Sequence, residues 1–257
     1  MSKSCCFIDI DGCVISEDGC VNNEYYQSLS WLAKYILQAN VGNCPNIRIC
    51  SGRNIPFVEA IFYLIGRPDN QWSIIENGSV FFKPASREIL VNPAIPQKTL
   101  AIFAKIRQKI VPRILKEYPC LWLYPGNIVN ITFSKKVESS LDINLIREAI
   151  RYMLAYPVKK REIIIKSLKY SISIMPYGVN KGTAVDFLAQ NEEINLRSSL
   201  GIGDSESDIL FLRKMKLIGC PANANEKCRN FVKENRGRVS PFNYAQGVAD
   251  IIKYFTS

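Results

Sequence analysis

The chain has 257 residues, 33 Lys and Arg against 23 Asp and Glu, and a formal net charge of +10. No apolar run approaches the roughly 20 residues that cross a bilayer, so we expect no membrane span. The sequence has no histidine, which excludes Ser-His-Asp and Cys-His nucleophile systems and histidine-ligated zinc. The nine cysteines form no C-x-x-C pair, and Asp9 comes too early for a signal-peptide core. We therefore expect reduced thiols in a cytoplasmic protein.

The first part of the chain alternates between predicted strands and helices. We expect strands at Cys5 to Ile10, Asn46 to Cys50 and Ser73 to Glu76, and helices at 24–39 and 56–65. This alternation is typical of a parallel sheet in an α/β fold.

The pattern changes near residue 82. Residues 97–117 and 141–155 have the periodicity of helices, whereas 121–134 and 162–175 each read as a pair of extended segments. The order predicts an inserted α+β domain with an antiparallel sheet and two helices.

After the insert the α/β rhythm returns. A helix is expected from Lys181, a strand at Ser199 to Gly203, and helices at 205–214, 224–234 and 246–255. The predicted fold is thus a Rossmann-like α/β core of residues 1–81 and 179–257, interrupted by a cap at 82–178.

Four polar clusters stand where ligands bind in parallel sheets, at the carboxyl ends of strands and beside helix starts. They are Asp9-x-Asp11-Gly12, Ser51-Gly52-Arg53, Lys181-Gly182 and Gly203-Asp204-Ser205-x-Ser207-Asp208. Clustered carboxylates repel one another unless a cation lies among them, and oxygen ligands without histidine suit Mg²⁺. A hydroxyl, a lysine and free backbone amides suit a phosphate.

These motifs, in this order, resemble those of haloacid dehalogenase superfamily phosphatases. The similarity is to the branch with an α/β cap inserted after the third strand, which includes the Cof-like, sugar-phosphate and phosphoglycolate phosphatases. The turn Ile75-Glu76-Asn77-Gly78 also resembles that branch. The family pattern usually has Thr where this chain has Cys13, and we expect this difference to alter local hydrogen bonding but not the chemistry.

The resemblance implies roles for the acidic residues. Asp9 would be the nucleophile that forms an aspartyl-phosphate, and Asp11 would be the general acid and base. Mg²⁺ would be held by the Asp9 carboxylate, the Asp11 backbone carbonyl and Asp204. Asp208 would contribute to the metal site directly, through water or by orienting a ligand, unless it simply faces solvent at a helix start.

The resemblance also implies a set of phosphate and substrate contacts. These are Gly12, Ser51, Gly52, Arg53, Asn77 and Lys181. Two of them have structural alternatives, because Arg53 could form an ion pair and Asn77 could belong only to a hairpin turn.

The positive charge is concentrated in the predicted cap. Residues 82–178 hold 17 Lys and Arg against 6 Asp and Glu, a balance of +11, and the core balance is −1. Alternation along the predicted strands places small polar side chains on one face of the cap sheet. They are Asn130, Thr132, Ser134, Lys169, Ser171 and Ser173. By the resemblance, that face would lie over the active site and contact the substrate.

The leading hypothesis is a Mg²⁺-dependent hydrolase of small phosphorylated metabolites, such as sugar phosphates, sugar-acid phosphates or phosphoglycolate. A sugar phosphomutase of the phosphomannomutase type is an alternative, because it shares this cap type. A basic nucleic-acid-binding protein is a further alternative that would leave the carboxylate cluster unexplained. We expect a small phosphorylated substrate as partner and no membrane, and nucleic acid is disfavoured as a partner; no oligomeric state is predicted.

Overall fold

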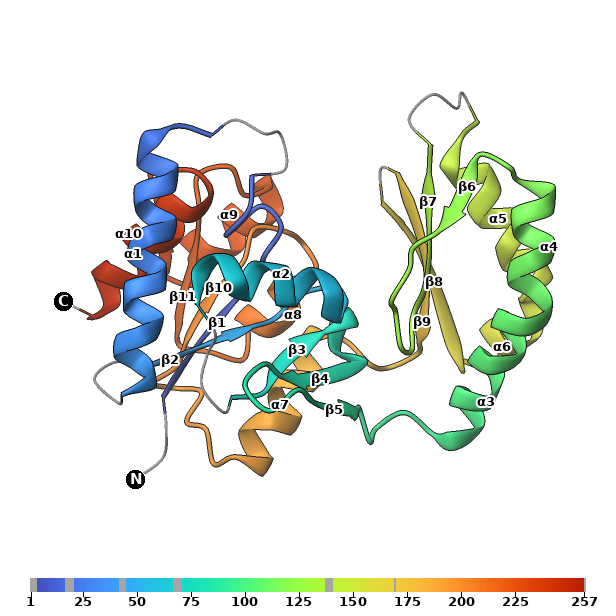
Figure 1. Cartoon of the computed structure of the whole chain (residues 1–257), viewed down its shortest axis with the longest axis horizontal. Helices are drawn as coiled ribbons and strands as arrows, with labels where there is room; N and C mark the ends of the chain where they lie inside the picture. The colour runs from blue at the N-terminus through green and yellow to red at the C-terminus, as the bar shows by residue number, and fades with distance from the viewer. Residues whose placement is uncertain are drawn as a thin grey trace. The chain divides into compact units, whose positions relative to one another are not determined.

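A computed structural model of the chain describes residues 4–16, 21–41, 45–66, 71–136, 141–168 and 170–256. These residues form two compact units (Figure 1). The first comprises Met1–Leu90 and Asn180–Ser257, and the second comprises Val91–Val179. Each unit has its own hydrophobic core.

A five-stranded parallel sheet is the centre of the first unit. Its order is β12 (Arg238–Val239), β11 (Leu217–Cys220), β10 (Leu200–Ile202), β1 (Cys5–Ile8) and β2 (Asn46–Ile49). All pairs are parallel, and Ile8 pairs with Ile202 on one side and Ile49 on the other. The predicted α/β core is confirmed. The prediction missed β11 because a four-residue apolar run is too short to separate strand from helix.

Helices cover both faces of this sheet. The helices α7 (Lys181–Asn191), α8 (Ile209–Leu212) and α9 (Glu226–Glu234) share a core with β1, in which Phe7, Val185 and Phe211 are buried. The helices α1 (Asn23–Asn40), α2 (Ile55–Ile65) and α10 (Tyr244–Thr256) form another packed group that contacts β2, β10 and β11.

The third predicted strand does not lie inside the parallel sheet. The strand β3 (Ser73–Ile75) forms an antiparallel sheet with β4 (Val80–Lys83) and β5 (Glu88–Val91). A parallel bridge between Cys50 and Ile74 joins it to the segment after β2, where the Ser51 N–H donates to the Ile74 carbonyl at 2.9 Å. The predicted strand itself is confirmed, and the hairpin turn that the sequence allowed at Asn77 joins it to β4. The expectation that it continues the parallel sheet was wrong, because its main pairing is with β4.

The predicted helix at 205–214 is shorter in the structure, where α8 covers Ile209–Leu212. The Asp208 carboxylate accepts hydrogen bonds from the backbone N–H groups of Asp204 and Ser205, at 3.1 and 2.9 Å. These bonds hold 204–208 as a turn, in the way that aspartate side chains compete with helix formation.

The second unit is an antiparallel sheet with helices along one face (Figure 1). The sheet order is β6 (Leu121–Leu123), β7 (Ile131–Lys135), β9 (Ser171–Pro176) and β8 (Ile163–Leu168). The helices are α3 (Gln97–Lys105), α4 (Val111–Glu117), α5 (Ile143–Met153) and α6 (Ala155–Lys159). This α+β unit confirms the predicted class of the inserted region.

The helix predicted at 97–117 contains a π-helical segment, Ile106–Ile110, between α3 and α4. Pro112 stands in the first turn of α4 and has no N–H to donate to the preceding turn. A widened turn accommodates this missing bond, so the long helix continues instead of breaking.

No helix among the described residues is both long and apolar enough to cross a membrane. Seven of the nine cysteines lie in those ranges, and all seven are free thiols. Six of them are buried, as predicted for core thiols.

Candidate functional site

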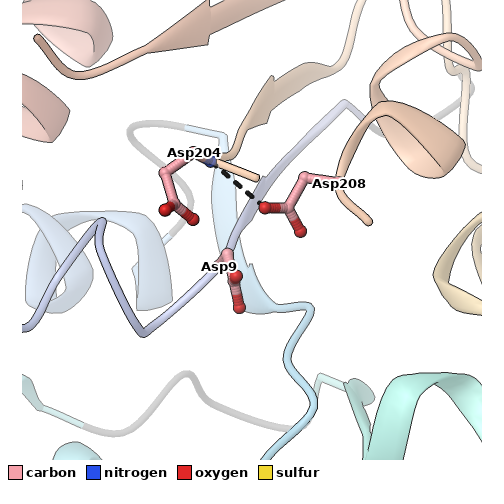
Figure 2. Close-up of side chains that lie close together, drawn as sticks. All are labelled: Asp9, Asp204 and Asp208. Carbon is pink, nitrogen blue, oxygen red and sulfur yellow. Dashed lines mark hydrogen bonds between the residues drawn. The ribbon is translucent and has the colours of Figure 1, made fainter. Parts of the chain in front are cut away.

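Three carboxylates converge at the carboxyl end of the parallel sheet (Figure 2). Asp9 follows β1 and Asp204 follows β10, and the parallel pairing of these strands sets the two residues side by side. Asp208 joins them from the end of the following turn. One oxygen from each carboxylate lies within 4.8 Å of the others, so the three can hold a metal ion.

Lys181 is the cation that faces these acids. Its Nζ lies 2.6 Å from an Asp208 oxygen and 3.0 Å from an Asp9 oxygen, and its side chain is 3 % exposed. With all four groups ionised, the three acids and one lysine carry two excess negative charges. This excess, in a buried site with oxygen donors, fits a hard divalent cation.

The start of α7 holds Lys181 in place. Asn180 caps this helix by accepting hydrogen bonds from the N–H groups of Gly182 and Thr183, at 2.9 and 3.1 Å. A Cβ on Gly182 would lie 2.2 Å from the Leu210 carbonyl oxygen, so only glycine permits this close approach of α7 to α8. The Asn-Lys-Gly-Thr sequence thereby directs the lysine at the carboxylates.

Burial, followed by the Asp208 carboxylate, raises the pKa of Asp9 to about 7, and Lys181 offsets only part of this increase. Burial alone would also raise the pKa of Asp208. Its ion pair with Lys181 and its hydrogen bonds from Ser205 outweigh burial, and the pKa of Asp208 is lowered. Burial disfavours the charged form of Lys181, but the two carboxylates raise its pKa well above the usual range. Asp208 and Lys181 are therefore a stable ion pair, whereas Asp9 titrates near neutrality.

Asp208 is fully buried, so the alternative that it faces solvent is wrong. One carboxylate oxygen pairs with Lys181. The other accepts bonds from the Asp204 and Ser205 N–H groups and from the Ser205 hydroxyl at 2.7 Å. Asp208 thus shapes the loop that carries Asp204.

Gly12 allows the loop after Asp9 to approach Asp204. Its φ of +72° is in the left-handed region, and a Cβ there would lie 2.3 Å from an Asp204 carboxylate oxygen. A side chain at position 12 would therefore displace Asp204 as well as strain the backbone. The Gly12 carbonyl in turn accepts a hydrogen bond from Asn223.

Asp11 does not join the three-carboxylate cluster within the described part of the chain. Its side chain forms a two-point ion pair with Arg53, from Nε at 2.8 Å and from Nη2 at 2.6 Å. The guanidinium also lies 4.3 Å from the centre of the Phe57 ring. Arg53 therefore forms an ion pair, as one of its two alternatives predicted, and the partner is Asp11.

Ser51 and Gly52 lie in the loop after β2, and the Glu76–Gly78 turn packs against them. Ser51 is fully buried, and its hydroxyl accepts a bond from the Arg53 N–H at 3.2 Å. The Asn77 N–H donates to the Ser51 carbonyl at 3.1 Å, and a Cβ on Gly52 would approach the Asn77 amide to 3.1 Å. Asn77, with φ of 56°, also belongs to the hairpin between β3 and β4. The structure therefore brings the Glu76–Gly78 turn to the Ser51-Gly52-Arg53 loop.

Two asparagines at this end of the sheet were missed by the sequence analysis. The Asn223 amide donates to the Gly12 carbonyl at 2.8 Å and accepts from the Tyr244 N–H at 2.8 Å. The Asn225 N–H donates to the Asp204 carbonyl at 2.8 Å. The available signal was an Asn-x-Asn loop after an apolar run, and it was missed because that run, β11, was not predicted.

The small polar residues of the second unit partly follow the predicted face. Thr132 pairs with Ser173 and Ser134 with Ser171, and the Thr132 and Ser173 hydroxyls lie 3.1 Å apart. The opposite face of the sheet packs against the helices, as predicted. Asn130 is buried and precedes β7, and Lys169 lies outside the described residues. Lys166 pairs with Ser173, so an exposed lysine of β8 lies on the polar face.

Arg107, in the π-helical segment, holds the loop before β7. Its Nη2 lies 2.8 to 3.3 Å from four consecutive carbonyl oxygens, those of residues 127–130. The Asn127 amide then donates to the Thr132 hydroxyl at 3.2 Å. A single guanidinium thus fixes the loop that borders the polar face.

Residues 124–252 match the family model of haloacid dehalogenase-like hydrolases. A phosphoglycolate phosphatase from Thermoplasma volcanium is 23 % identical over 248 residues, which are 96 % of each chain. This similarity extends through both units.

Solved structures share the fold. A haloacid dehalogenase-like hydrolase from Bacteroides thetaiotaomicron superposes with a TM-score of 0.71 at 14 % identity, covering 98 % of this chain and 99 % of the other. The sucrose-phosphatase of Synechocystis sp. PCC6803, solved with sucrose and phosphate, has a TM-score of 0.65 at 16 % identity, with 99 % and 98 % covered.

Proposed function

The chain belongs to the haloacid dehalogenase-like hydrolases and is a phosphatase, and from this premise we propose that it hydrolyses small phosphate monoesters through an aspartyl-phosphate. The observation that carries the proposal is the cluster of Asp9, Asp204 and Asp208 around Lys181. The unit with the parallel sheet would be the catalytic core, and the inserted unit would be its cap.

In the first step, an Asp9 carboxylate oxygen attacks phosphorus and the ester P–O bond breaks. Asp11 donates a proton to the departing alkoxide. In the second step, Asp11 takes a proton from a water molecule, which attacks the same phosphorus and releases phosphate and Asp9. Asp11 must be protonated before the first step and ionised before the second. Arg53 would be a positioning residue, because its two hydrogen bonds orient the ionised Asp11 carboxylate, the form that takes the proton from water.

The excess negative charge of the cluster supports Mg²⁺ as the cofactor. The Asp9 carboxylate, the Asp11 backbone carbonyl and Asp204 would hold the ion, and Asp208 would orient the loop of Asp204. When bound, Mg²⁺ offsets the repulsion between the Asp9 carboxylate and the incoming phosphate.

The remaining groups of the core suit a phosphoryl group. Lys181 and the Ser51 hydroxyl would balance charge on its oxygens, and the backbone of Gly12 and Gly52 would leave room for it. Asn77 would contact the substrate from the turn that packs on Ser51.

The substrate would be a small phosphorylated metabolite of the sugar-phosphate, sugar-acid-phosphate or phosphoglycolate type. The similarity to the phosphoglycolate phosphatase of Thermoplasma volcanium supports this class. Free, mostly buried thiols favour a reducing compartment such as the cytoplasm.

A phosphate-release screen tests the proposal. The purified chain would be assayed with phosphoglycolate, sugar phosphates and sugar-acid phosphates, each with Mg²⁺ and with EDTA. We expect metal-dependent release from at least one substrate and an acid-stable phosphoenzyme that is absent in Asp9→Asn. Asp186→Asn, an exposed carboxylate paired with Lys214, is the matched control and should keep full activity. Release without metal, or a phosphoenzyme in Asp9→Asn, would refute the assignment.

A further inference from the structure

The helical side of the second unit carries a surface with no role in the proposed reaction. We define the basic helical surface by the exposed side chains of Lys105, Lys109 and Lys116 on the α3–α4 segment, and of Arg151, Tyr152 and Tyr156 on α5 and α6. Figure 1 shows these helices along the same face of the β6–β9 sheet.

The basic helical surface points away from the polar face of that sheet. The helices bury Phe103 and Ile114 from one segment, and Ile146 from the other, in the core beneath them. Thr132 and Ser173 lie on the opposite side of the sheet. A substrate held by those hydroxyls therefore does not contact the lysines of α3 and α4.

The charge of this surface is not neutralised locally. The α3–α4 segment, 97–117, holds six Lys and Arg and one acid, Glu117, which lies 3.8 Å from Arg113. Among residues that the structure describes, none of Lys105, Lys109 and Lys116 lies within 4.0 Å of a carboxylate oxygen. Several unpaired cations on one face produce a positive potential that attracts polyanions.

Two exposed tyrosines belong to the α5–α6 part of this surface, and Lys160 Nζ lies 5.9 Å from the centre of the Tyr156 ring. Tyr152 is 86 % exposed and Tyr156 is 72 % exposed, at the junction between α5 and α6. Exposed rings beside lysines and arginines are the combination that binds single-stranded nucleic acid, because bases stack on the rings while the cations contact phosphates. A membrane fits less well, because the isoleucines of α5 are buried in the core and Leu145 is the one aliphatic side chain that this helix exposes.

We propose that the basic helical surface binds single-stranded nucleic acid. This goes beyond the proposed phosphatase activity and does not depend on it. It also revises the low rank given to nucleic acid as a partner, because a nucleic-acid-binding surface on the second unit does not compete with the carboxylate cluster of the first. Total charge alone cannot distinguish a solvated surface from a binding surface, and the exposed tyrosines beside Lys160 and Arg151 are what favours nucleic acid as the occupant.

Fluorescence anisotropy with a labelled 20-nucleotide oligouridylate tests this proposal. We expect binding that weakens with salt, since each phosphate contact contributes about −0.7 to the slope of log K against log salt. The triple variant Lys105→Glu, Lys109→Glu, Lys116→Glu should lose at least tenfold in affinity, with a slope that is shallower by about 2. A control triple variant changes the net charge equally at exposed sites of the first unit, through Lys34→Glu, Arg197→Glu and Lys216→Glu. Its affinity for the oligonucleotide should fall less than threefold.

The tyrosines separate nucleic acid from other polyanions. The double variant Tyr152→Ala, Tyr156→Ala should bind oligouridylate at least fivefold more weakly than the wild type. It should bind inorganic polyphosphate with the affinity of the wild type. Equal losses in the two charge-reversal variants would overturn the proposal, as would unchanged oligouridylate binding by the tyrosine variant. Binding to phosphatidylserine vesicles without binding to oligouridylate would also overturn it. Circular dichroism and phosphatase rates should match the wild type in every variant.

Discussion

Arg53 holds Asp11 through two parallel hydrogen bonds, at 2.8 and 2.6 Å, so the guanidinium plane fixes the carboxylate plane. A guanidinium provides this fork geometry and an ammonium does not. The Phe57 ring, 4.3 Å from the guanidinium carbon, supports it from one side.

We expect Arg53→Lys to lower kcat about tenfold for alkyl phosphates, because Asp11 would lose its orientation while charge is kept. The loss should be smaller for p-nitrophenyl phosphate, whose leaving group needs less protonation. Steady-state rates with both substrates measure the difference. Arg87→Lys is the control, because Arg87 is exposed and pairs with Glu59 at 3.5 Å. Equal losses for both leaving groups would show that Arg53 does not act through Asp11.

Asp9→Asn should abolish turnover and yet stabilise the metal-free protein. The pKa of Asp9 is raised to about 7, so ionising it costs folding free energy. The cost is absent below the unfolded pKa of 3.8 and is complete once the pH has risen above about 7. The Tm of Asp9→Asn in EDTA should thus exceed that of the wild type at pH 8 and match it more closely at pH 5. An unchanged Tm difference between these two pH values would contradict this.

Lys181→Met should destabilise the fold by about 3–5 kcal/mol, because it leaves Asp208 buried without its cation. Adding Asp208→Asn should recover part of this loss by removing the uncompensated charge. Urea unfolding of the two variants measures both effects. Lys214→Met, which breaks an exposed ion pair with Asp186, should cost less than about 1 kcal/mol. A double variant less stable than Lys181→Met would show that the pair is not the source of the loss.

Binding of Mg²⁺ should weaken at acid pH, because Asp9 must lose its proton before it can bind the ion. Below a pKa of about 7, the apparent dissociation constant should rise roughly tenfold for each unit of pH. Calorimetric titration at pH 5.5, 6.5 and 7.5 would follow this, with proton release at the lower values. Asp9→Asn should bind more weakly with little dependence on pH in this range. A wild-type constant that is flat from pH 5.5 to 7.5 would rule out Asp9 as the titrating ligand.

Gly12→Ala and Gly178→Ala form a matched pair. Both glycines have positive φ, +72° and +81°, but only Gly12 has neighbours within 4 Å of an added Cβ. Gly178→Ala should cost about 1 kcal/mol of stability through backbone strain alone and should keep activity. Gly12→Ala should cost more and lose activity, because its methyl group would collide with the Asp204 carboxylate. Urea midpoints and phosphate release measure both, and similar effects of the two changes would contradict the steric argument.

The grouping of Asp9, Ser51 and Asp204 could be predicted from the sequence because it follows from topology. Residues that follow neighbouring parallel strands meet at one edge of the sheet whatever the strand order. The family resemblance then supplied expected roles. The position of Asp208 was harder to predict. Whether its side chain is buried or faces solvent depends on an ion pair with Lys181, which lies 27 residues earlier in the sequence.

Other features depended on contacts that no local pattern records. The placement of β3 depends on its pairing with β4, and Asn223 became visible only once β11 was known to end beside Gly12. The sequence also could not predict which carboxylate pairs with Arg53, because several carboxylates were expected at that edge of the sheet.

The loop at residues 127–130 is built like a cation-binding site whose cation is tethered to the chain. Four successive carbonyl oxygens point at the Arg107 guanidinium, and the covalent link means that this charge can never dissociate. Inserting or deleting one residue would move a carbonyl out of reach and leave the guanidinium undersolvated in a partly buried place. Chains that keep this arginine should therefore keep the length of the loop, and diversity at the polar face should arise by exchange of side chains such as Asn127.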